Sequence, residues 1–185
     1  MEEKIIKYFS ELPIHKGNKK NPYVILFDAL IGMGKSTVAK VISKLDDSVI
    51  LNNDEARYDL NYYGDSTIIY ELQHKRMIEL LKNNNSCIID CNFSNNRKQR
   101  LKQIYDLGYP VYVIRLECSE EIIKERILNR TVVVGDNYST ALYDEYLEMK
   151  NETTNIDDNL ISFIINTEKN IEIQVEEFLN KYDLI

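Results

Sequence analysis

Residues 23–37 read YVILFDALIGMGKST, an apolar run that leads directly into a glycine-containing turn. The run at 23–28 is continuous in apolar residues, which is typical of a strand buried on both faces of a parallel sheet. The turn after it carries Gly32 and Gly34. Four apolar residues then recur at helical spacing: Val38, Val41, Ile42 and Leu45. The stretch therefore predicts a strand, a tight turn and a helix in immediate succession.

The turn matches the phosphate-binding pattern GxxxxGK(S/T) except at its first glycine, which is Ala29 here. Backbone N–H groups can curl around phosphate oxygens at Gly32 and Gly34, and the helix that follows adds the positive end of its dipole. A methyl group at position 29 narrows the turn and is tolerated only if φ is negative there. We expect this loop to bind the phosphates of a nucleotide.

Side chains of the same loop supply the charged and polar contacts. Lys35 is expected to reach the β- and γ-phosphates, and the Ser36 hydroxyl is a candidate Mg²⁺ ligand. Met33 and Thr37 complete the predicted nucleotide-binding set. The sequence has no guanine-reading pattern of the NKxD type, which favours ATP as the nucleotide. The implied cofactors are ATP and Mg²⁺.

Strand and helix patterns alternate along the rest of the chain. Further strands are predicted at 49–51, 86–91, 111–117 and 161–165, and helices at 66–82, near 101–105, from 119 onward and near 175–182, with 131–139 as an irregular interruption. This order implies one α/β domain over residues 1–185, a three-layer sandwich with a mostly parallel five-stranded sheet. We expect helices on both faces, a helical lid at about 126–140, and ligands at the carboxyl ends of the strands.

Composition narrows the class of protein. The 185 residues carry 23 basic and 30 acidic side chains, so the net charge of −7 argues against broad non-specific nucleic-acid binding, although a local basic groove stays open. The three cysteines, Cys87, Cys91 and Cys118, are odd in number and most have strand-like flanks, which predicts apolar packing in a reducing setting. The sequence shows no secretory pattern and no membrane-length apolar run. We expect a cytoplasmic protein with no membrane partner; the oligomeric state stays open.

Polar residues follow the second and third predicted strands. Asp54 and Arg57 lie three positions apart, so both can point into one cleft, although Asp54 is equally suited to cap a helix. The third strand ends in Asp90 and reaches Asn92, which places a carboxylate and an amide beside the phosphate loop. A carboxylate there commonly assists a metal ion or fixes an arginine, so Asp90 is a second candidate Mg²⁺ ligand. Asp90 and Asn92 are also candidate substrate-binding residues.

Arginines mark the predicted lid. Arg126 and Arg130 are four positions apart on one helix face and precede a tract with Gly135, as a hinged lid needs, although a solvated basic face is the plain alternative. Arg97, beside an asparagine-rich turn, is a candidate for the wall of an acceptor site. Asn166 follows the last strand, and the family resemblance given next makes it a candidate contact of the adenine ring.

These motifs resemble the polynucleotide-kinase-like and zeta-toxin-like branch of small P-loop kinases, which includes AAA-type predicted kinases, over Tyr23 to about Phe178. In that family a D-x-x-R motif, a D-x-N motif and paired lid arginines follow the phosphate loop. The matching residues here are Asp54 and Arg57, Asp90 and Asn92, and Arg126 and Arg130.

The resemblance implies a P-loop NTPase fold and a role for each motif. Asp54 would be the general base for an acceptor hydroxyl, Arg57 would contact a phosphate of the acceptor, and the lid arginines would clamp the ATP phosphates. The implied reaction is transfer of the γ-phosphoryl group of ATP, with a polynucleotide 5′-hydroxyl end as the first expectation. Two alternatives stay open: a kinase of a nucleoside, sugar, antibiotic or nucleotide-sugar, and an ATP-binding switch that transfers nothing.

Overall fold

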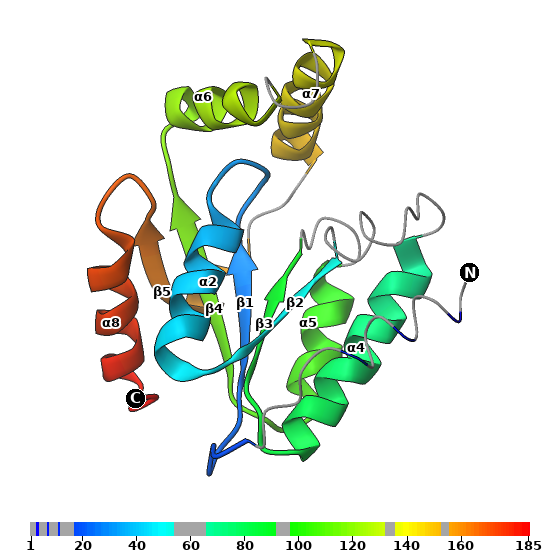
Figure 1. The fold of residues 1–185 in the computed structure, drawn as a ribbon, viewed down its shortest axis with the longest axis vertical. Coiled ribbons are helices and arrows are strands. Elements are labelled where there is room, and N and C mark those ends of the chain that lie inside the picture. The colour runs from blue at the N-terminus through cyan, green and yellow to red at the C-terminus, as the bar shows by residue number, and fades with distance from the viewer. Residues whose placement is uncertain are drawn as a thin grey trace.

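The fold is built on one parallel sheet (Figure 1). The computed structural model describes residues 17–53, 66–91, 97–131, 136–152 and 156–185, and the single residues Glu3, Lys7 and Glu11. Within these residues the five strands are β1 (Val24–Asp28), β2 (Val49–Asn52), β3 (Cys87–Asp90), β4 (Val111–Glu117) and β5 (Ile161–Asn166). Their order is β2-β3-β1-β4-β5, and every neighbouring pair is parallel. The predicted five-stranded α/β architecture is confirmed.

Helices cover both faces of the sheet. They are α2 (Lys35–Asp46), α4 (Ser66–Lys82), α5 (Arg97–Tyr105), α6 (Glu120–Thr131), α7 (Asp136–Glu152) and α8 (Ile171–Lys181), with a 3₁₀ turn at Asp158–Leu160. Side chains of α2 and α8 share one apolar core with the sheet, and side chains of α4 and α5 share the other. Helices α6 and α7 stand beyond the carboxyl edge of the sheet, where the lid is predicted (Figure 1).

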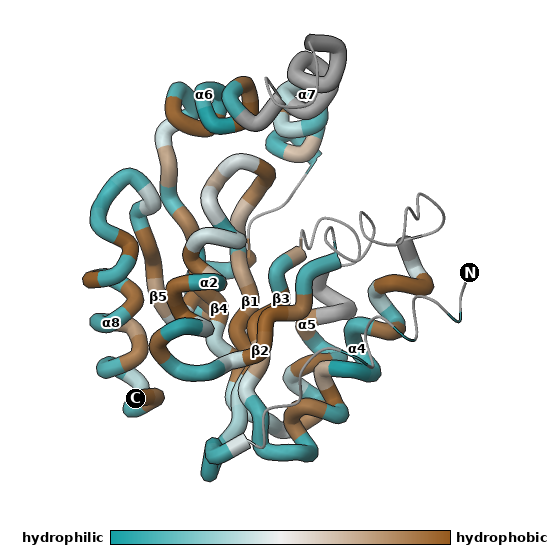
Figure 2. The backbone as a smooth tube through the Cα atoms, in the orientation of Figure 1, coloured by the Kyte–Doolittle hydropathy of each residue, from teal (hydrophilic) through white to brown (hydrophobic). Residues whose placement is uncertain are grey.

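The central strand β1 shows why the sheet forms the core. Its five residues are all buried, and alternate side chains face opposite layers. Ile25 and Phe27 pack towards α2 and α8, whereas Val24 and Leu26 pack towards α4 and α5. Each such side chain contributes about 1.5–3 kcal/mol when fully buried. Apolar residues accordingly gather in the strands, and hydrophilic residues lie along the outer sides of the helices (Figure 2).

The second lid helix differs from the sequence prediction. The tract 131–139 was expected to be irregular, but Thr131 ends α6 and α7 already begins at Asp136, while residues 132–135 lie outside the described chain. Tyr143, Tyr146 and Leu147 have helical spacing and join the apolar cluster of α6. The two tyrosine rings stack with their centroids 5.8 Å apart. Packing on α6 therefore favours a helix where local composition favours a turn.

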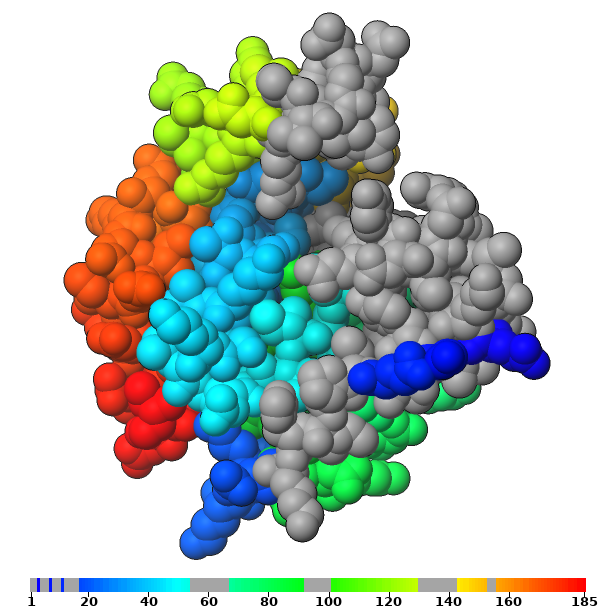
Figure 3. All heavy atoms as spheres, in the orientation of Figure 1, coloured from blue at the N-terminus to red at the C-terminus, as the bar shows by residue number. Residues whose placement is uncertain are grey.

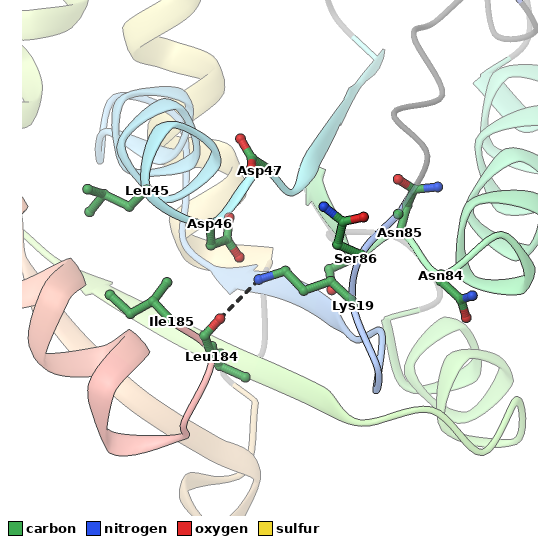
Figure 4. A pocket seen from close by; sticks show the side chains of 11 residues that line it. Lys19, Leu45, Asp46, Asp47, Asn84, Asn85, Ser86, Leu184 and Ile185 are labelled. Atoms are coloured by element: carbon green, nitrogen blue, oxygen red, sulfur yellow. Dashed lines mark hydrogen bonds between the residues drawn. The ribbon is translucent and has the colours of Figure 1, made fainter.

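At the amino edge of the sheet, buried polar groups pair with one another. The Asp46 carboxylate, 4% exposed, accepts hydrogen bonds from the Tyr23 hydroxyl, from Ser48 N at 2.9 Å and from Ser48 Oγ at 2.6 Å. A cavity of about 620 Å³ opens beside this group, and in it Lys19 Nζ donates to the Leu184 carbonyl at 3.0 Å (Figure 4). The bonds to Asp46 fix the end of α2 to Tyr23, the residue before β1. The bond from Lys19 to Leu184 joins the segment before β1 to the segment after α8.

Candidate nucleotide and acceptor site

The phosphate loop joins β1 to α2, and two of its residues have left-handed backbone conformations. Gly32 has φ 79° and Gly34 has φ 94°, values that residues other than glycine rarely adopt. The Gly34 carbonyl accepts hydrogen bonds from Thr37 N and Val38 N, both at 3.1 Å, and so starts α2. The loop therefore has the conformation that directs N–H groups towards a bound anion.

Ala29 occupies the place of the first glycine of the pattern without strain. Among the described residues other than glycine, positive φ values occur only at three turn positions: Asp47, Asn84 and Asp183. Ala29 is not one of them, and its methyl group is buried in the core under α2. Alanine at position 29 is therefore tolerated, because φ is not positive there, as expected from the sequence.

The lid lies directly on the phosphate loop. A Cβ atom added at Gly32 would come within 3.0 Å of Ile123 Cγ2 and of Ile127 Cγ1, so α6 leaves no room for a side chain there. The loop side chains Leu30, Ile31 and Met33 pack against the apolar cluster of the lid. The space-filling view shows α6 resting over this loop (Figure 3). Position 32 therefore favours glycine for two reasons, its left-handed φ and the close contact with α6, and the two glycines, Lys35 and Ser36 are residues that fit the phosphates of a nucleotide.

Polar side chains of the loop are positioned at its opening. Lys35 Nζ donates to the Leu30 carbonyl at 2.7 Å, which holds the ammonium group over the loop. Leu30 N donates to Met33 Sδ at 3.1 Å, and a thioether is a weak acceptor that an anionic oxygen can replace. Ser36 lies in the first turn of α2 and is partly exposed. Its hydroxyl is therefore available to a ligand.

A buried carboxylate marks the carboxyl end of β3, the strand beside β1. Asp90 is 4% exposed, and it pairs in register with Asn52 of β2. Asn52 Nδ2 donates to Asp90 Oδ2 at 3.0 Å. The pairing orients the carboxylate at the edge where the phosphate loop begins. Asn52, which the motif search passed over, is thus part of the support of this group.

A second buried carboxylate, Asp28, anchors the base of the loop. Arg115 Nε on β4 donates to Asp28 at 2.8 Å, while its two terminal nitrogens donate to Asp158 at 2.5 Å and to the Ile156 carbonyl at 2.7 Å. Burial disfavours the charged guanidinium, but the hydrogen bonds to the two carboxylates outweigh it and raise the pKa of Arg115. One arginine therefore ties the loop to the segment that follows the lid.

A cavity of about 410 Å³ lies between the loop and the lid. It is lined by Gly32, Gly34, Thr37, Arg126, Asn129, Thr167 and Ile171. The Arg126 guanidinium donates to Thr167 Oγ1 at 2.9 Å and to the Thr167 carbonyl at 2.8 Å. Arg126 thus connects α6 to the turn between β5 and α8, and it lies at the rim of the cavity beside the phosphate loop.

Asn166 is occupied by its own turn. Its Oδ1 accepts a hydrogen bond from Glu168 N at 2.9 Å, and its backbone N and O pair with the side chain of Gln174. The next residue, Thr167, is the one that lines the cavity. Asn129 also lines it and went unnoticed in the sequence, although it is three positions after Arg126, one helical turn along α6.

Several predicted site residues cannot be placed by this geometry. Asp54, Arg57 and Asn92 lie outside the described residues. For Arg97 and Arg130 the structure gives the backbone, in α5 and α6 respectively. The motif residues that it does bring together at the carboxyl edge are therefore the phosphate loop, Asp90 and Arg126. In the described part of the chain, no helix is both long enough and apolar enough to span a membrane.

Several solved structures with the same fold carry the name of a kinase. The APS kinase of Mycobacterium tuberculosis, solved with AMPPNP and APS, is 14% identical, with 88% of this chain and 98% of that chain covered and a TM-score of 0.61. A gluconokinase of Sinorhizobium meliloti is 16% identical, with 86% and 90% covered and a TM-score of 0.56. The shikimate kinase of Acinetobacter baumannii, solved with shikimate, is 16% identical, with 89% and 94% covered and a TM-score of 0.55. At these identities the likeness shows the fold alone.

Sequence comparison identifies the family. No curated protein matches the chain. The profile of an AAA domain family matches residues 24–151, from the first strand through the phosphate loop and most of the lid. With that match over more than half of its length, and with the phosphate-loop geometry described above, the chain belongs to this AAA domain family and has the α/β fold of small P-loop kinases.

Proposed function

We propose that this protein is a kinase that transfers the γ-phosphoryl group of ATP to a hydroxyl group of a small molecule. The observation that carries the proposal is the phosphate loop: Gly32 and Gly34 line the cavity that Arg126 rims, and the Lys35 ammonium group lies on the loop at the Leu30 carbonyl. The buried Asp90 on the adjacent strand adds a carboxylate at the same edge. A protein that only bound ATP would have no evident need for Asp54, the base that the sequence offers for an acceptor hydroxyl.

On the donor side, the protein supplies positioning and positive charge. Loop N–H groups and Lys35 would hold the phosphates, while Arg126 and Arg130 would stabilise charge that develops on the transferred group. Ser36 and Asp90 are the residues that would hold Mg²⁺. When bound, the ion neutralises charge on the phosphate oxygens. Thr167, Ile171 and Asn129 would line the space for the rest of the nucleotide.

On the acceptor side, Asp54 would remove the proton from the attacking hydroxyl. The acceptor oxygen forms a bond to the γ-phosphorus as the bond to the β–γ bridging oxygen breaks, and ADP leaves with that electron pair. The proton ends on the Asp54 carboxylate. Arg57, three residues on, would hold an anionic group of the acceptor.

The charges of the site favour a small acceptor. Arg115 is already paired with two carboxylates, and Arg126 with Thr167. A polynucleotide needs several unpaired basic residues along its backbone, and the chain as a whole carries a charge of −7. Three solved structures with this fold are an APS kinase, a gluconokinase and a shikimate kinase, names that point to small-molecule substrates. A polynucleotide 5′-hydroxyl end is the second candidate, favoured by the Asp54-x-x-Arg57 spacing of the sequence.

The test is transfer of label from γ-labelled ATP with Mg²⁺ to two panels, pooled small metabolites and 5′-hydroxyl oligonucleotides, with Lys35→Ala as the blank. We expect label among the small molecules, and a loss of about 10²–10⁴-fold in Asp54→Asn but not in the control Asp47→Asn. Label on oligonucleotide ends alone would make the second candidate correct. ATP binding with no transfer to either panel would contradict both and favour the switch.

A further inference from the structure

Asn53, which directly follows β2, carries a buried amide without partners. Its side chain is 3% exposed, and its Nδ2 and Oδ1 atoms have essentially no exposed surface. Neither atom makes a hydrogen bond to any residue in the part of the chain that the structure describes. Buried polar groups are nearly always paired, because losing water without a replacement is unfavourable. This unpaired amide therefore needs a physical explanation.

The neighbouring amides show that the surroundings can satisfy such groups. Asn52 Nδ2 donates to Asp90 Oδ2 at 3.0 Å. Gln73 of α4 donates through Nε2 to the Leu51 carbonyl at 2.9 Å. Only Asn53 among these three amides lacks a bond within the described residues. A leucine has the same branched shape with no polar atoms, so packing alone does not account for an amide at this position.

The position of Asn53 in the sheet points to a ligand. It lies at the carboxyl edge, the side on which parallel α/β sheets bind their substrates. It follows Asn52, the partner of Asp90, and precedes Asp54, the proposed general base. Resting on the proposed kinase function, we infer that Asn53 binds the acceptor, and that its amide pairs with two adjacent hydroxyl groups of a polyhydroxylated small molecule.

The chemistry of an amide selects this class of acceptor. Asn53 offers one N–H₂ donor and one carbonyl acceptor on a single planar group without charge. Two neighbouring hydroxyl groups supply both a donor and an acceptor. A phosphate or carboxylate supplies acceptors only, so it would leave Oδ1 unpaired. The amide therefore matches a sugar or polyol better than a purely anionic acceptor.

The burial of the amide adds a condition to binding. Because both polar atoms are covered, the acceptor can reach them only after the packing around Asn53 opens. Acceptor binding is then coupled to a local rearrangement around Asn53. The hydrogen bonds that the correct acceptor makes to the amide would favour the rearranged state.

A pair of leucine substitutions tests the unpaired state itself. Asn53→Leu removes two unpaired atoms and should raise Tm by about 2–4 °C. The control is Asn85→Leu at the amino edge, where an amide that is also 3% exposed donates to the Asn83 carbonyl at 3.1 Å. The control should lower Tm. An equal fall in Asn53→Leu would show that the amide is already satisfied and would overturn the inference.

Probe binding tests the acceptor class. Thermal shifts in the presence of AMPPNP are measured with glucose, ribose, gluconate, glycerol and inositol, with singly deoxygenated analogues of the sugars, and with 5′-hydroxyl oligonucleotides. We expect at least one polyol to bind wild type and Asn85→Leu with an apparent Kd roughly 10–100-fold lower than that of Asn53→Leu. Its deoxygenated analogue should not distinguish the variants. Equal binding of every probe to Asn53→Leu and wild type, or Asn53-dependent binding of oligonucleotides only, would overturn the inference.

The same probes with γ-labelled ATP separate this inference from the proposed function. Asn53-dependent binding without phosphoryl transfer would support the acceptor contact and contradict the kinase. Transfer that is unaffected in Asn53→Leu would support the kinase and contradict the contact. Neither binding nor transfer with any probe would contradict both.

Discussion

One buried polar side chain at each edge of the sheet gives a contrast: Asp46 at the amino edge is fully paired, and Asn53 at the carboxyl edge is not paired with any described residue. At the amino edge, the Asp46 carboxylate receives three hydrogen bonds from Tyr23 and Ser48. At the carboxyl edge, the Asn53 amide has none within the described chain, and a loop N–H donates to the weak acceptor Met33 Sδ. Buried polar groups whose hydrogen bonds are all made stabilise the fold. Groups with unmade or weak hydrogen bonds can still bond to a ligand. Substitutions at the amino edge should therefore change stability, and those at the carboxyl edge should change activity.

The largest expected effect is on activity at the carboxyl edge. Lys35→Ala removes the ammonium group from the phosphate loop and should lower kcat/KM for ATP by at least the loss of about 10²–10⁴-fold expected of Asp54→Asn. Tm should change little, because the residue is only partly buried. The matched control is Lys44→Ala, an exposed residue near the other end of the same helix. Equal activity in the two variants would break the comparison.

The next effect is on stability at the amino edge. Asp46→Asn replaces one acceptor oxygen by an NH₂ donor that faces the Tyr23 and Ser48 donors, and should lower the free energy of unfolding by about 2–3 kcal/mol. Urea denaturation measures it, with the adjacent and exposed Asp47→Asn as the control. Phosphoryl transfer per folded molecule should stay at the wild-type level. A loss of turnover comparable to that of Lys35→Ala would show that the two edges are not separate.

Two glycines with nearly the same positive φ isolate the contact between loop and lid. Gly32 has φ 79° and Gly108 has φ 77°, so an alanine at either position carries the same left-handed strain of about 1–2 kcal/mol. Only at Gly32 would the new Cβ meet the lid; at Gly108 it would meet nothing within 4 Å. Gly32→Ala should therefore lower Tm by about 2–4 °C more than Gly108→Ala. It should also weaken ATP binding in calorimetry. Equal Tm and equal ATP binding in the two variants would mean that α6 moves to make room for the new methyl group.

The smallest expected effect is a change in how stability depends on pH, and it concerns Tyr23. Burial, and then the negative charge of Asp46, raise the pKa of its hydroxyl above the ordinary value of about 10. The folded state thus keeps a proton that the unfolded chain loses, so its stabilisation is complete below about pH 10 and falls above it. Tyr23→Phe should flatten this fall by up to about 1.4 kcal/mol per pH unit. Urea unfolding from pH 8 to 11 measures the two slopes, and parallel slopes would contradict the argument.

The sequence predicts elements well where apolar periodicity and a motif agree. The run at 23–28 and the GKS turn predicted β1, the loop and α2, and all three are confirmed. The start of α7 was missed, because its local residues favour a turn and only contact with α6 favours a helix. The contacts of a lid arginine could not be predicted, because its partners come from distant segments of the chain. Arg126 bonds to Thr167, 41 residues away, and no local pattern announces that contact.

The acceptor side could be predicted only in part. The sequence offers Asp54, Arg57 and Asp90 as chemical groups, and the structure places Asp90 beside Asn52. Whether a given amide finds a partner depends on packing between strand and helix, so Asn53 looks the same as Asn52 in the sequence. Asn53 differs from its neighbour only once the fold brings Asp90 to one amide and not to the other.

The arginine that anchors the phosphate loop also bears on how the chain folds. Arg115 bonds to Asp28, 87 residues before it, and to Asp158, 43 residues after it. Both chain closures must occur before the guanidinium is satisfied, so we expect this cluster to form late on the folding pathway. A change such as Arg115→Gln should then speed unfolding far more than it slows refolding, with a φ-value near zero. The loop that binds phosphate would thus be among the last parts of the molecule to become rigid.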